Sequence, residues 1–385
     1  MGGSTIEGRF TLKTKIYFNK DSLMQLKEVS GTRAFIVSDP IMEKLGYLQK
    51  ALNYLNEAGI SSKTFTGVRP DPDIKLITDG LKLFNDSGAD ILIALGGGSA
   101  IDTAKAILFF AQKFTQSIGA EIKKPLFIAI PSTSGTGSEV TDFSVVTASG
   151  EKVVIIDEEI APDIAILDST CIENLPKHIV ADTGIDVLVH AVEAYVSTKA
   201  TDFTDALAEK AITLLFENLE TLYKDTKNEE ARNHVHNASC IAGIAFTNAG
   251  LGINHSLAHA MGGAFHIPHG RCNAVLLNAV IEYNADLAGK ADSYATERYA
   301  KLAAVLHLPA RTRREGTVSF LSAISKLKKA VGMEDNIKSL GIGQEEFESI
   351  LGHMAESALN DRCTPTNPRK PAKEELLVLF RKCYG

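Results

Sequence analysis

The sequence is poor in cysteine, in long hydrophobic runs and in dense basic stretches. Its five cysteines are an odd number without C-x-x-C spacing, which argues against a disulfide framework or a zinc ribbon and predicts reduced thiols in the cytoplasm. No apolar run approaches the roughly 20 residues that span a bilayer, and the first residues lack a signal-peptide core. The formal net charge is −7, and the one short basic run, residues 311–314, is followed by Glu315. We therefore expect neither a nucleic-acid partner nor a membrane partner.

The length of 385 residues indicates two domains, and the hydrophobic fraction of 45% and charged fraction of 23% are typical of a globular protein. The first residues form an exception. Gly2-Gly3-Ser4 precedes Ile6-Glu7-Gly8-Arg9, which resembles a protease-cleavage linker, so residues 1–9 are left out of the fold prediction. A native segment is the alternative interpretation.

The first half of the chain alternates between short apolar runs and amphipathic stretches. The apolar runs are residues 34–37, 90–95, 126–130 and 164–167. Strands that are buried on both faces have this composition, and the stretches between them, such as residues 77–84, show helical periodicity. The pattern predicts a Rossmann-like α/β domain with a parallel sheet.

The second half changes character. Long patterns rich in Ala, Leu, Glu and Lys predict helices at residues 206–222, 294–306, 318–331 and 345–359. We place the boundary within residues 169–183. The prediction is an α/β domain over residues 10–180 and an all-α domain over residues 181–385.

Two polar loops follow predicted strands. Gly96-Gly97-Gly98 follows the strand at 90–95 and opens a helix, where free backbone N–H groups suit a pyrophosphate. Ile101 stands where a G-x-G-x-x-G motif has its third Gly, so a plain strand-to-helix turn is the alternative. Residues 131–138 form a second loop, rich in Ser, Thr and Gly, after the strand at 126–130. Ligands of open α/β sheets bind at this edge, although a loop of this kind also satisfies its own backbone.

Asp39 follows the predicted strand at 34–37. A carboxylate there can bind a ribose diol and repels a 2′-phosphate, which favours NAD over NADP. An acidic residue in this position is also a common helix N-cap.

Histidines are concentrated in the helical half. Asp186 and His190 are four residues apart and share one helix face, and His255, His259, His266 and His269 follow within fifteen residues of one another. Imidazole and carboxylate together suit Fe(II) or Zn(II). The spacing predicts a metal site, but it does not distinguish which of the four later histidines bind.

These residues resemble the iron-dependent (group III) alcohol dehydrogenase family from Phe10 onward. The resemblance rests on Gly96-Gly97-Gly98-Ser99 with Asp102 and Lys105, residues 131–139, Gly184-x-Asp186-x-x-x-His190-Ala191-x-Glu193, residues 255–270 and residues 367–369. Residues 203–210, 236–239 and 249–252 are most similar to the propanol and ethanol dehydrogenases of propanediol- and ethanolamine-utilisation microcompartments.

The resemblance implies a dehydroquinate-synthase-like architecture and assigns site residues. The implied metal ligands are Asp186, His190, His255 and His269, and His259 is implied to lie beside nicotinamide and substrate as a proton relay without binding the metal. The implied cofactor contacts are Asp39, Gly97, Gly98, Ser99, Asp102, Thr133, Ser134, Thr136 and Lys152. Asp71 departs from the family pattern, in which many members have Asn, and Cys363 resembles a position in the substrate cleft.

The activity that the resemblance implies is NAD(H)-linked interconversion of short-chain primary alcohols and aldehydes, with Fe(II) or Zn(II), in a cleft between the two domains. The implied substrates are propanal and 1-propanol, or acetaldehyde and ethanol. The alternatives are an oxidoreductase of the same family acting on diols or lactaldehyde, a dehydroquinate-synthase-like lyase, and a non-catalytic metal-binding or shell-interaction protein. We further expect a homodimer or larger homo-oligomer in the cytoplasm, inside a bacterial microcompartment beside its other enzymes.

Overall fold

The computed structural model describes residues 8–117, 119, 123–148, 151–289 and 291–385. The linker predicted at residues 1–9 lies outside the described residues except for Gly8 and Arg9. All five cysteines are free and buried. Among the described residues, no helix is both long and apolar enough to cross a membrane.

The chain divides into two compact units. The sheet unit comprises residues 13–183 and 221–243, and the helical unit comprises the described residues up to Leu12 together with residues 184–220 and 244–385. Residues 221–243 follow the predicted boundary near residue 180 and yet belong to the sheet unit. The reason is visible in α7 (Glu229–Ala249), whose Gly243 packs on the backbone of Gly137 in the sheet unit.

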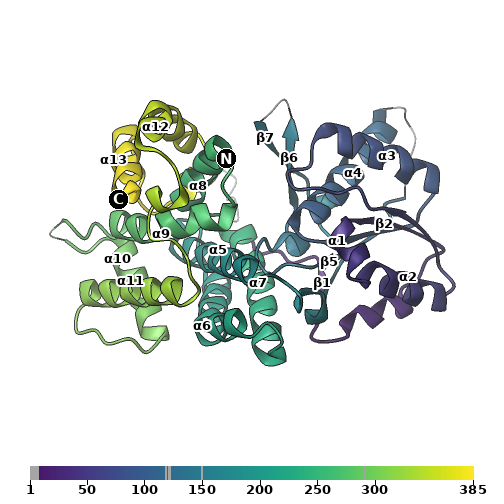
Figure 1. Ribbon diagram of the computed structural model, residues 1–385, viewed down its shortest axis with the longest axis horizontal. Helices are drawn as coiled ribbons and strands as arrows, with labels where there is room; N and C mark the ends of the chain where they lie inside the picture. Colours follow the sequence, from purple (N-terminus) through teal and green to yellow (C-terminus); the bar gives the residue numbers. More distant parts are fainter. Residues whose placement is uncertain (1–7, 118, 120–122, 149–150, 290) are drawn as a thin grey trace, which may run out of the picture. The chain divides into compact units, whose positions relative to one another are not determined.

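The sheet unit is built on six parallel strands in the order β1-β8-β5-β4-β2-β3. Figure 1 labels β1, β2 and β5 of this sheet. These strands are β1 (Lys15–Phe18), β2 (Arg33–Ser38), β3 (Ser61–Phe65), β4 (Ile91–Gly96), β5 (Leu126–Pro131) and β8 (Ile164–Leu167). Four of them, β2, β4, β5 and β8, confirm the predicted apolar runs. A small antiparallel pair, β6 (Phe143–Ala148) and β7 (Glu151–Ile156), completes the strands.

The two faces of this sheet carry separate apolar cores, because successive side chains of a strand point to opposite faces. Ile36 and Ile93 contribute to one core, with Leu48 and Leu55 of α2 packed on them. Phe35 and Leu92 contribute to the other, under helices α3 and α4. The helices of this unit are α1 (Pro40–Lys44), α2 (Tyr47–Glu57), α3 (Ile74–Ser87) and α4 (Gly98–Ser117). Coverage on both faces explains why the central strands read as continuous apolar runs.

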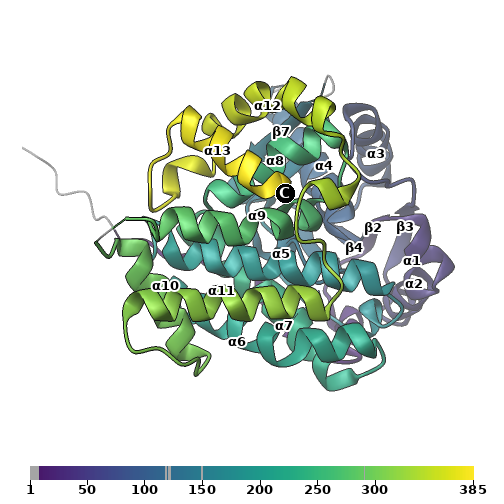
Figure 2. The same cartoon turned by 60° about the vertical axis from the view of Figure 1, so that its left-hand side comes forward.

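The helical unit contains the predicted all-α architecture. Its helices are most of α5 (Lys177–Val196), most of α6 (Asp202–Lys224), the end of α7, and α8 (Ile253–Phe265), α9 (His269–Asn284), α10 (Tyr294–Val305), α11 (Arg313–Ala330), α12 (Gln344–Leu359) and α13 (Lys373–Tyr384). Short 3₁₀ helices occur in both units, at Ser22–Glu28, Ser138–Val140, Glu158–Ile160, Ser169–Ile172, Lys338–Leu340 and Thr364–Thr366. Figure 2 shows α10 and α11 side by side, and these two helices are in contact.

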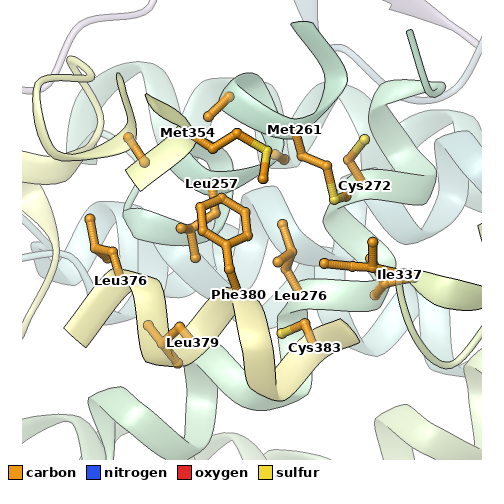
Figure 3. Packing of buried hydrophobic residues seen from close by; sticks show 14 of the residues in the cluster. Leu257, Met261, Cys272, Leu276, Ile337, Met354, Leu376, Leu379, Phe380 and Cys383 are labelled. Carbon is orange, nitrogen blue, oxygen red and sulfur yellow. The ribbon is translucent and has the colours of Figure 1, made fainter. Parts of the chain in front are cut away.

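One apolar cluster of the helical unit fixes α8 and α9, which carry His255, His259 and His269. Leu257 and Met261 of α8 pack with Leu276 of α9, and Met354 of α12 and Phe380 of α13 close the cluster (Figure 3). Burial of this many large side chains holds the two helices in a defined register. The polar residues on their opposite faces are therefore held in place by a rigid support.

Candidate metal and cofactor sites

Helix α5 places Asp186 and His190 on one face, as the four-residue spacing predicted. Both side chains are buried. The His190 ring stacks between two rings of the same unit, Phe246 and His255, with centroid separations of 4.5 Å to each. This helix therefore brings a carboxylate and an imidazole to the start of α8.

Helices α8 and α9 bring two more imidazoles to Asp186. One ligand atom each of Asp186, His255 and His269 lies within 4.8 Å of the other two. The Asp186 Oδ1 atom is 3.8 Å from His255 Nε2 and 3.5 Å from His269 Nε2. His266, by contrast, is exposed and ends α8 with a left-handed backbone, at φ 55°. Of the four later histidines, the structure thus brings His255 and His269 to the carboxylate.

Glu193 lies behind His255. Its Oε2 atom is 2.5 Å from His255 Nδ1, and its Oε1 atom accepts a hydrogen bond from the backbone N–H of Asn254. A Cβ on Gly252 would lie 2.8 Å from Oε1, so only glycine leaves room for this carboxylate. When Nδ1–H of His255 donates to Glu193, the Nε2 lone pair faces Asp186, and this is the tautomer that a metal ligand requires.

Burial dominates the electrostatics of this cluster. It raises the pKa of Asp186, and it raises the pKa of Glu193 to about 8 although backbone N–H groups of Asn254, Gly252 and His255 oppose that shift. Burial also lowers the pKa of His255 well below its usual value, with His269 and His259 adding to the effect. Burial thus disfavours charge on both Asp186 and His255 when no cation is counted. The donor set of one carboxylate and imidazole nitrogens fits Fe(II) or Zn(II).

Asn273, one turn after His269 on α9, reaches the same three ligand atoms. Its Nδ2 atom is 2.6 Å from Asp186 Oδ1, 3.0 Å from His269 Nε2 and 3.3 Å from His255 Nε2. The amide is fully buried. It is therefore the immediate neighbour of the candidate ligands.

His259 belongs to a second group, with Asp361 and Cys363. Its Nδ1 atom is 2.9 Å from Asp361 Oδ2, and the other Asp361 oxygen accepts from the backbone N–H of Cys363 and from Ser256. Burial raises the pKa of the Cys363 thiol well above its usual value, which disfavours the thiolate that a metal needs. Within this group, Asp361 orients the imidazole of His259.

The predicted cofactor loops meet at one edge of the sheet. Asp39 follows β2, Gly97 follows β4, and the second loop follows β5, and these three strands are neighbours. From β2 the chain continues to β3 on one side, and β4 then lies on the other side of β2. Such a reversal of strand order forms the crevice in which doubly wound sheets bind dinucleotides.

The two glycines after β4 let this loop and the second loop lie close together. A Cβ on Gly98 would lie 2.8 Å from Thr136 Cγ2, and a Cβ on Gly97 would lie 3.4 Å from Thr133 Cγ2. Ser99 lies in the first turn of α4, whose backbone N–H groups and dipole favour a phosphate. Any side chain at Gly98 would collide with Thr136, so the close approach of the two loops requires glycine there.

Asp39 has two roles in this loop. Its Oδ1 atom caps α1 by accepting from the backbone N–H groups of Ile41 and Met42, the alternative that its position allowed. Its Oδ2 atom lies 2.7 Å from the position of a Cβ on Gly96, so this oxygen faces the glycine loop. The side chain is therefore a helix cap with one oxygen directed to the candidate cofactor site.

Asp102 and Ser134 support the second loop from beneath. Asp102 accepts from the Ser138 hydroxyl and the Val145 N–H, while buried Lys105 donates to Ser138 O, Thr141 Oγ1 and Phe143 O. Burial lowers the pKa of Lys105 to about 8. The Ser134 hydroxyl lies 2.9 Å from Nδ1 of buried His236 on α7. These contacts place Asp102 and Ser134 in the support of the loop.

Lys152 lies on the β6–β7 pair. Its Nζ atom is 2.7 Å from Asp71 Oδ1, and both side chains are more than half exposed. Lys152, a predicted cofactor contact, is thus paired with Asp71, the residue at which many family members have Asn. The carboxylate competes with any anion for this ammonium.

Sequence reasoning assigned no role to Glu193, Asn273 or Asp361. Two of them carried a usable signal: Glu193 lies seven residues after Asp186 on the same face of α5, and Asn273 lies four residues after His269. Asp361 is 102 residues from His259, and no local pattern connects the two.

Comparison with known proteins shows the family to which the chain is related. Residues 13–169 match the family model described as iron-containing alcohol dehydrogenase, and residues 180–384 match that of the C-terminal part of the Fe-containing alcohol dehydrogenase family. An NADPH-dependent butanol dehydrogenase of Clostridium saccharobutylicum is 41% identical over 98% of each chain. A 1-propanol dehydrogenase of Citrobacter freundii is 39% identical over 96% of this chain and 98% of its own.

Solved structures show the same architecture. An iron-containing alcohol dehydrogenase of Thermococcus thioreducens matches 98% of this chain and 99% of its own with a TM-score of 0.90 and 37% identity. A sulfoacetaldehyde reductase of Bifidobacterium kashiwanohense, solved in complex with NAD⁺, matches 97% of this chain and 98% of its own with a TM-score of 0.85 and 25% identity. Both full-length relatives and both structures are oxidoreductases.

Proposed function

The chain belongs to the iron-containing alcohol dehydrogenase family, and from that premise we propose that it interconverts short-chain primary alcohols and aldehydes with NAD(H). The proposed substrates are propanal and 1-propanol, or acetaldehyde and ethanol. The observation that carries the proposal is the convergence of Asp186, His255 and His269 on one point of the helical unit. Family membership favours an oxidoreductase over a lyase of similar architecture and over a protein without activity.

The proposed metal ligands are Asp186, His190, His255 and His269. A divalent cation bound by them supplies Lewis acidity, which polarises a carbonyl group and favours deprotonation of an alcohol. Glu193 holds the ring of His255 in the tautomer that offers Nε2, and the stack on Phe246 orients the ring of His190. Outer contacts of this kind typically change metal affinity by about 10- to 100-fold.

The proposed cofactor contacts are Asp39, Gly97, Gly98, Ser99, Asp102, Thr133, Ser134, Thr136 and Lys152. NAD(H) supplies the hydride acceptor or donor. The first turn of α4 binds phosphate through N–H groups, and the outward oxygen of Asp39 accepts from a ribose hydroxyl. That oxygen repels a 2′-phosphate, so we propose NAD(H) although the butanol dehydrogenase relative is named NADPH-dependent.

His259 is the proposed proton relay. Its Nδ1–H donates to Asp361, so the second ring nitrogen, Nε2, is the atom that accepts or returns a proton. The side chain is 39% exposed, which lets it exchange that proton with solvent. The ring stacks on His269, with centroids 5.3 Å apart, and so lies beside the proposed ligands.

A coupled assay tests the proposal. Protein purified without oxygen is analysed for bound Fe and Zn, and initial rates are measured with NADH and NADPH on propanal, acetaldehyde, lactaldehyde and 3-hydroxypropanal. We expect kcat/KM with NADH and propanal or acetaldehyde to exceed the other combinations by at least about tenfold. Preference for lactaldehyde or 3-hydroxypropanal supports the diol-type alternative, and preference for NADPH contradicts the role of Asp39. Metal-loaded protein without turnover on any of these aldehydes contradicts the proposal.

Three further expectations stay predictions: a homodimer or larger homo-oligomer, a cytoplasmic location, and association with microcompartment enzymes. Sedimentation of the purified protein tests the first. Fractionation of the source cells tests the other two.

A further inference from the structure

The amide of Asn273 lies in the middle of the candidate ligands, and its geometry resembles that of a cation. One atom, Nδ2, reaches Asp186 Oδ1, His269 Nε2 and His255 Nε2 at 2.6, 3.0 and 3.3 Å. We propose that Asn273 is a positioning residue: its two N–H hydrogens bond to Asp186 and to an imidazole before a cation binds, and the amide releases the imidazole when one does. This proposal rests on the assignment of these residues as metal ligands.

Hydrogen bonding at the imidazoles makes the amide a competitor of the cation. A neutral imidazole has one nitrogen with a lone pair, and that lone pair points either to an N–H hydrogen or to a metal. His255 uses its Nδ1 for Glu193, so its Nε2 is the nitrogen that both Asn273 and a cation need. A carboxylate oxygen has more than one lone pair, and Asp186 Oδ1 can therefore keep its bond to Asn273 in both states.

A second amide fixes the orientation of the first. Asn254 donates through Nδ2 to Asn273 Oδ1 at 2.8 Å and to the backbone carbonyl of Asn273 at 3.2 Å. Both side chains are fully buried. Because the Asn273 oxygen is occupied on the side of Asn254, its NH₂ group is the end that faces the ligands. Rotation of the amide by half a turn would place its oxygen against the Asp186 carboxylate, which is unfavourable.

This arrangement has a measurable consequence for metal binding. In the wild-type protein a cation must displace at least one hydrogen bond between Asn273 and an imidazole, so part of its binding free energy is lost in the exchange. Removal of the amide removes that competition. A hydrogen bond of this kind contributes about 0.5–1.5 kcal/mol, which corresponds to about a 2- to 12-fold change in affinity.

The test compares the full chain with Asn273→Ala, each stripped of metal with a chelator. Zn²⁺ affinity is measured by competition with a chromophoric chelator, and thermal unfolding is measured with and without Zn²⁺. We expect the variant to bind Zn²⁺ about 3- to 10-fold more tightly, to unfold at a lower temperature than wild type without metal, and to show a larger rise of Tm on Zn²⁺ addition. Asn278→Ala is the matched control, because Asn278 lies on the same helix and bonds to Ser325 and Leu321 instead.

Two outcomes overturn the proposal. If Asn273→Ala shows the same Zn²⁺ affinity and the same metal-induced rise of Tm as wild type, its amide is merely structural. If it binds Zn²⁺ more weakly, the amide supports the bound state instead of competing with it. Should the alanine variant fail to fold, Asn273→Leu keeps the volume and removes the donor. If the wild-type protein binds no Zn²⁺ at all, the ligand assignment itself is wrong. That outcome is distinct from the two outcomes that overturn only the role of Asn273.

Discussion

The two candidate sites differ in the groups that form them: side chains form one, and mainly backbone forms the other. In the helical unit the site consists of side chains: Asp186, His255 and His269 from α5, α8 and α9 place their ligand atoms within 4.8 Å of one another. In the sheet unit the site consists mainly of backbone, because Gly97 and Gly98 carry no side chain where the start of α4 packs against Thr133 and Thr136. A site of the first kind is lost when atoms are removed, whereas a site of the second kind is lost when atoms are added.

The largest expected effect comes from truncation in the helical unit. His269→Ala removes one of the three convergent donors, so we expect bound metal to disappear and turnover to fall to background. Metal content by elemental analysis and NADH-linked turnover are the two measurements. Cofactor binding, measured by NADH fluorescence, should persist because the glycine loop is untouched.

His266→Asn is the matched control for this truncation. His266 ends α8 in the left-handed region, which Asn tolerates, and it is exposed. Metal and activity should both survive in this variant. Retention of full metal occupancy by His269→Ala would show that His269 is not a ligand.

The addition of one methyl group tests the sheet unit. Gly98→Ala places a Cβ 2.8 Å from Thr136 Cγ2, and overpacking of this kind costs about 1–3 kcal/mol. We expect the KM for NADH to rise about tenfold or more while metal content stays unchanged. Thr136→Ser removes the opposing methyl group, so the double variant should recover part of the loss. An unchanged KM in Gly98→Ala would exclude the start of α4 as the cofactor site.

The sequence predicted the buried parts of the fold and missed the exposed ones. The central strands β2, β4, β5 and β8 are apolar throughout because helices cover both faces of the sheet, and this composition is visible without a structure. The edge strand β3 reads Ser-Ser-Lys-Thr-Phe and is mostly exposed, so its pairing with β2 leaves no apolar signature. The pairing of β6 with β7 was missed as well. Backbone hydrogen bonds, which any residue can make, define these elements.

The candidate metal residues were predictable to the extent that they lie close together in the sequence. Asp186 and His190 share one turn of a helix, and the later histidines form one short segment, but only the packing of α8 against α9 brings His255 and His269 to Asp186. Asp361 contacts His259 across 102 residues, and no periodicity encodes such a contact. For the cofactor residues, the sequence did not show which side chains have other partners. In the structure Asp102 and Ser134 form hydrogen bonds that support their loop.

A buried imidazole of the sheet unit, outside the metal cluster, makes the folding stability depend on pH. Burial lowers the pKa of His236 to about 4, so between pH 6.5 and 4 the unfolded chain binds a proton that the folded chain does not. This difference is absent above pH 6.5 and grows as the pH falls, and at pH 5 it destabilises the folded state by about 2 kcal/mol. His236→Asn removes the titrating group and keeps a polar partner for Ser134.

Urea unfolding at pH 7.5 and pH 5.0 measures this effect. The wild-type midpoint should fall further between the two pH values than the midpoint of His236→Asn. Metal content serves as the control, because His236 belongs to the sheet unit and should leave it unchanged. Equal falls in both proteins would show that His236 is protonated in the folded state or contributes nothing to the acid response.

The smallest expected effect concerns the exposed pair of Lys152 and Asp71, two side chains that we expect to influence cofactor binding in the sheet unit. Both side chains are more than half exposed, so the ion pair is worth at most about 1 kcal/mol. Asp71→Asn frees the ammonium for an anionic cofactor, and we expect the KM for NADH to fall about 2- to 5-fold. Salt screens the competing ion pair, and at 0.5 M NaCl the Debye length falls to a few ångströms. The difference in KM between wild type and variant should therefore shrink at that salt concentration. Lys152→Gln should raise the KM and abolish the benefit of Asp71→Asn in the double variant. If Asp71→Asn still lowers the KM for NADH when Lys152 is replaced, Asp71 repels the cofactor directly. The overall charge near the candidate cofactor site, rather than the specific pair with Lys152, would then set the KM.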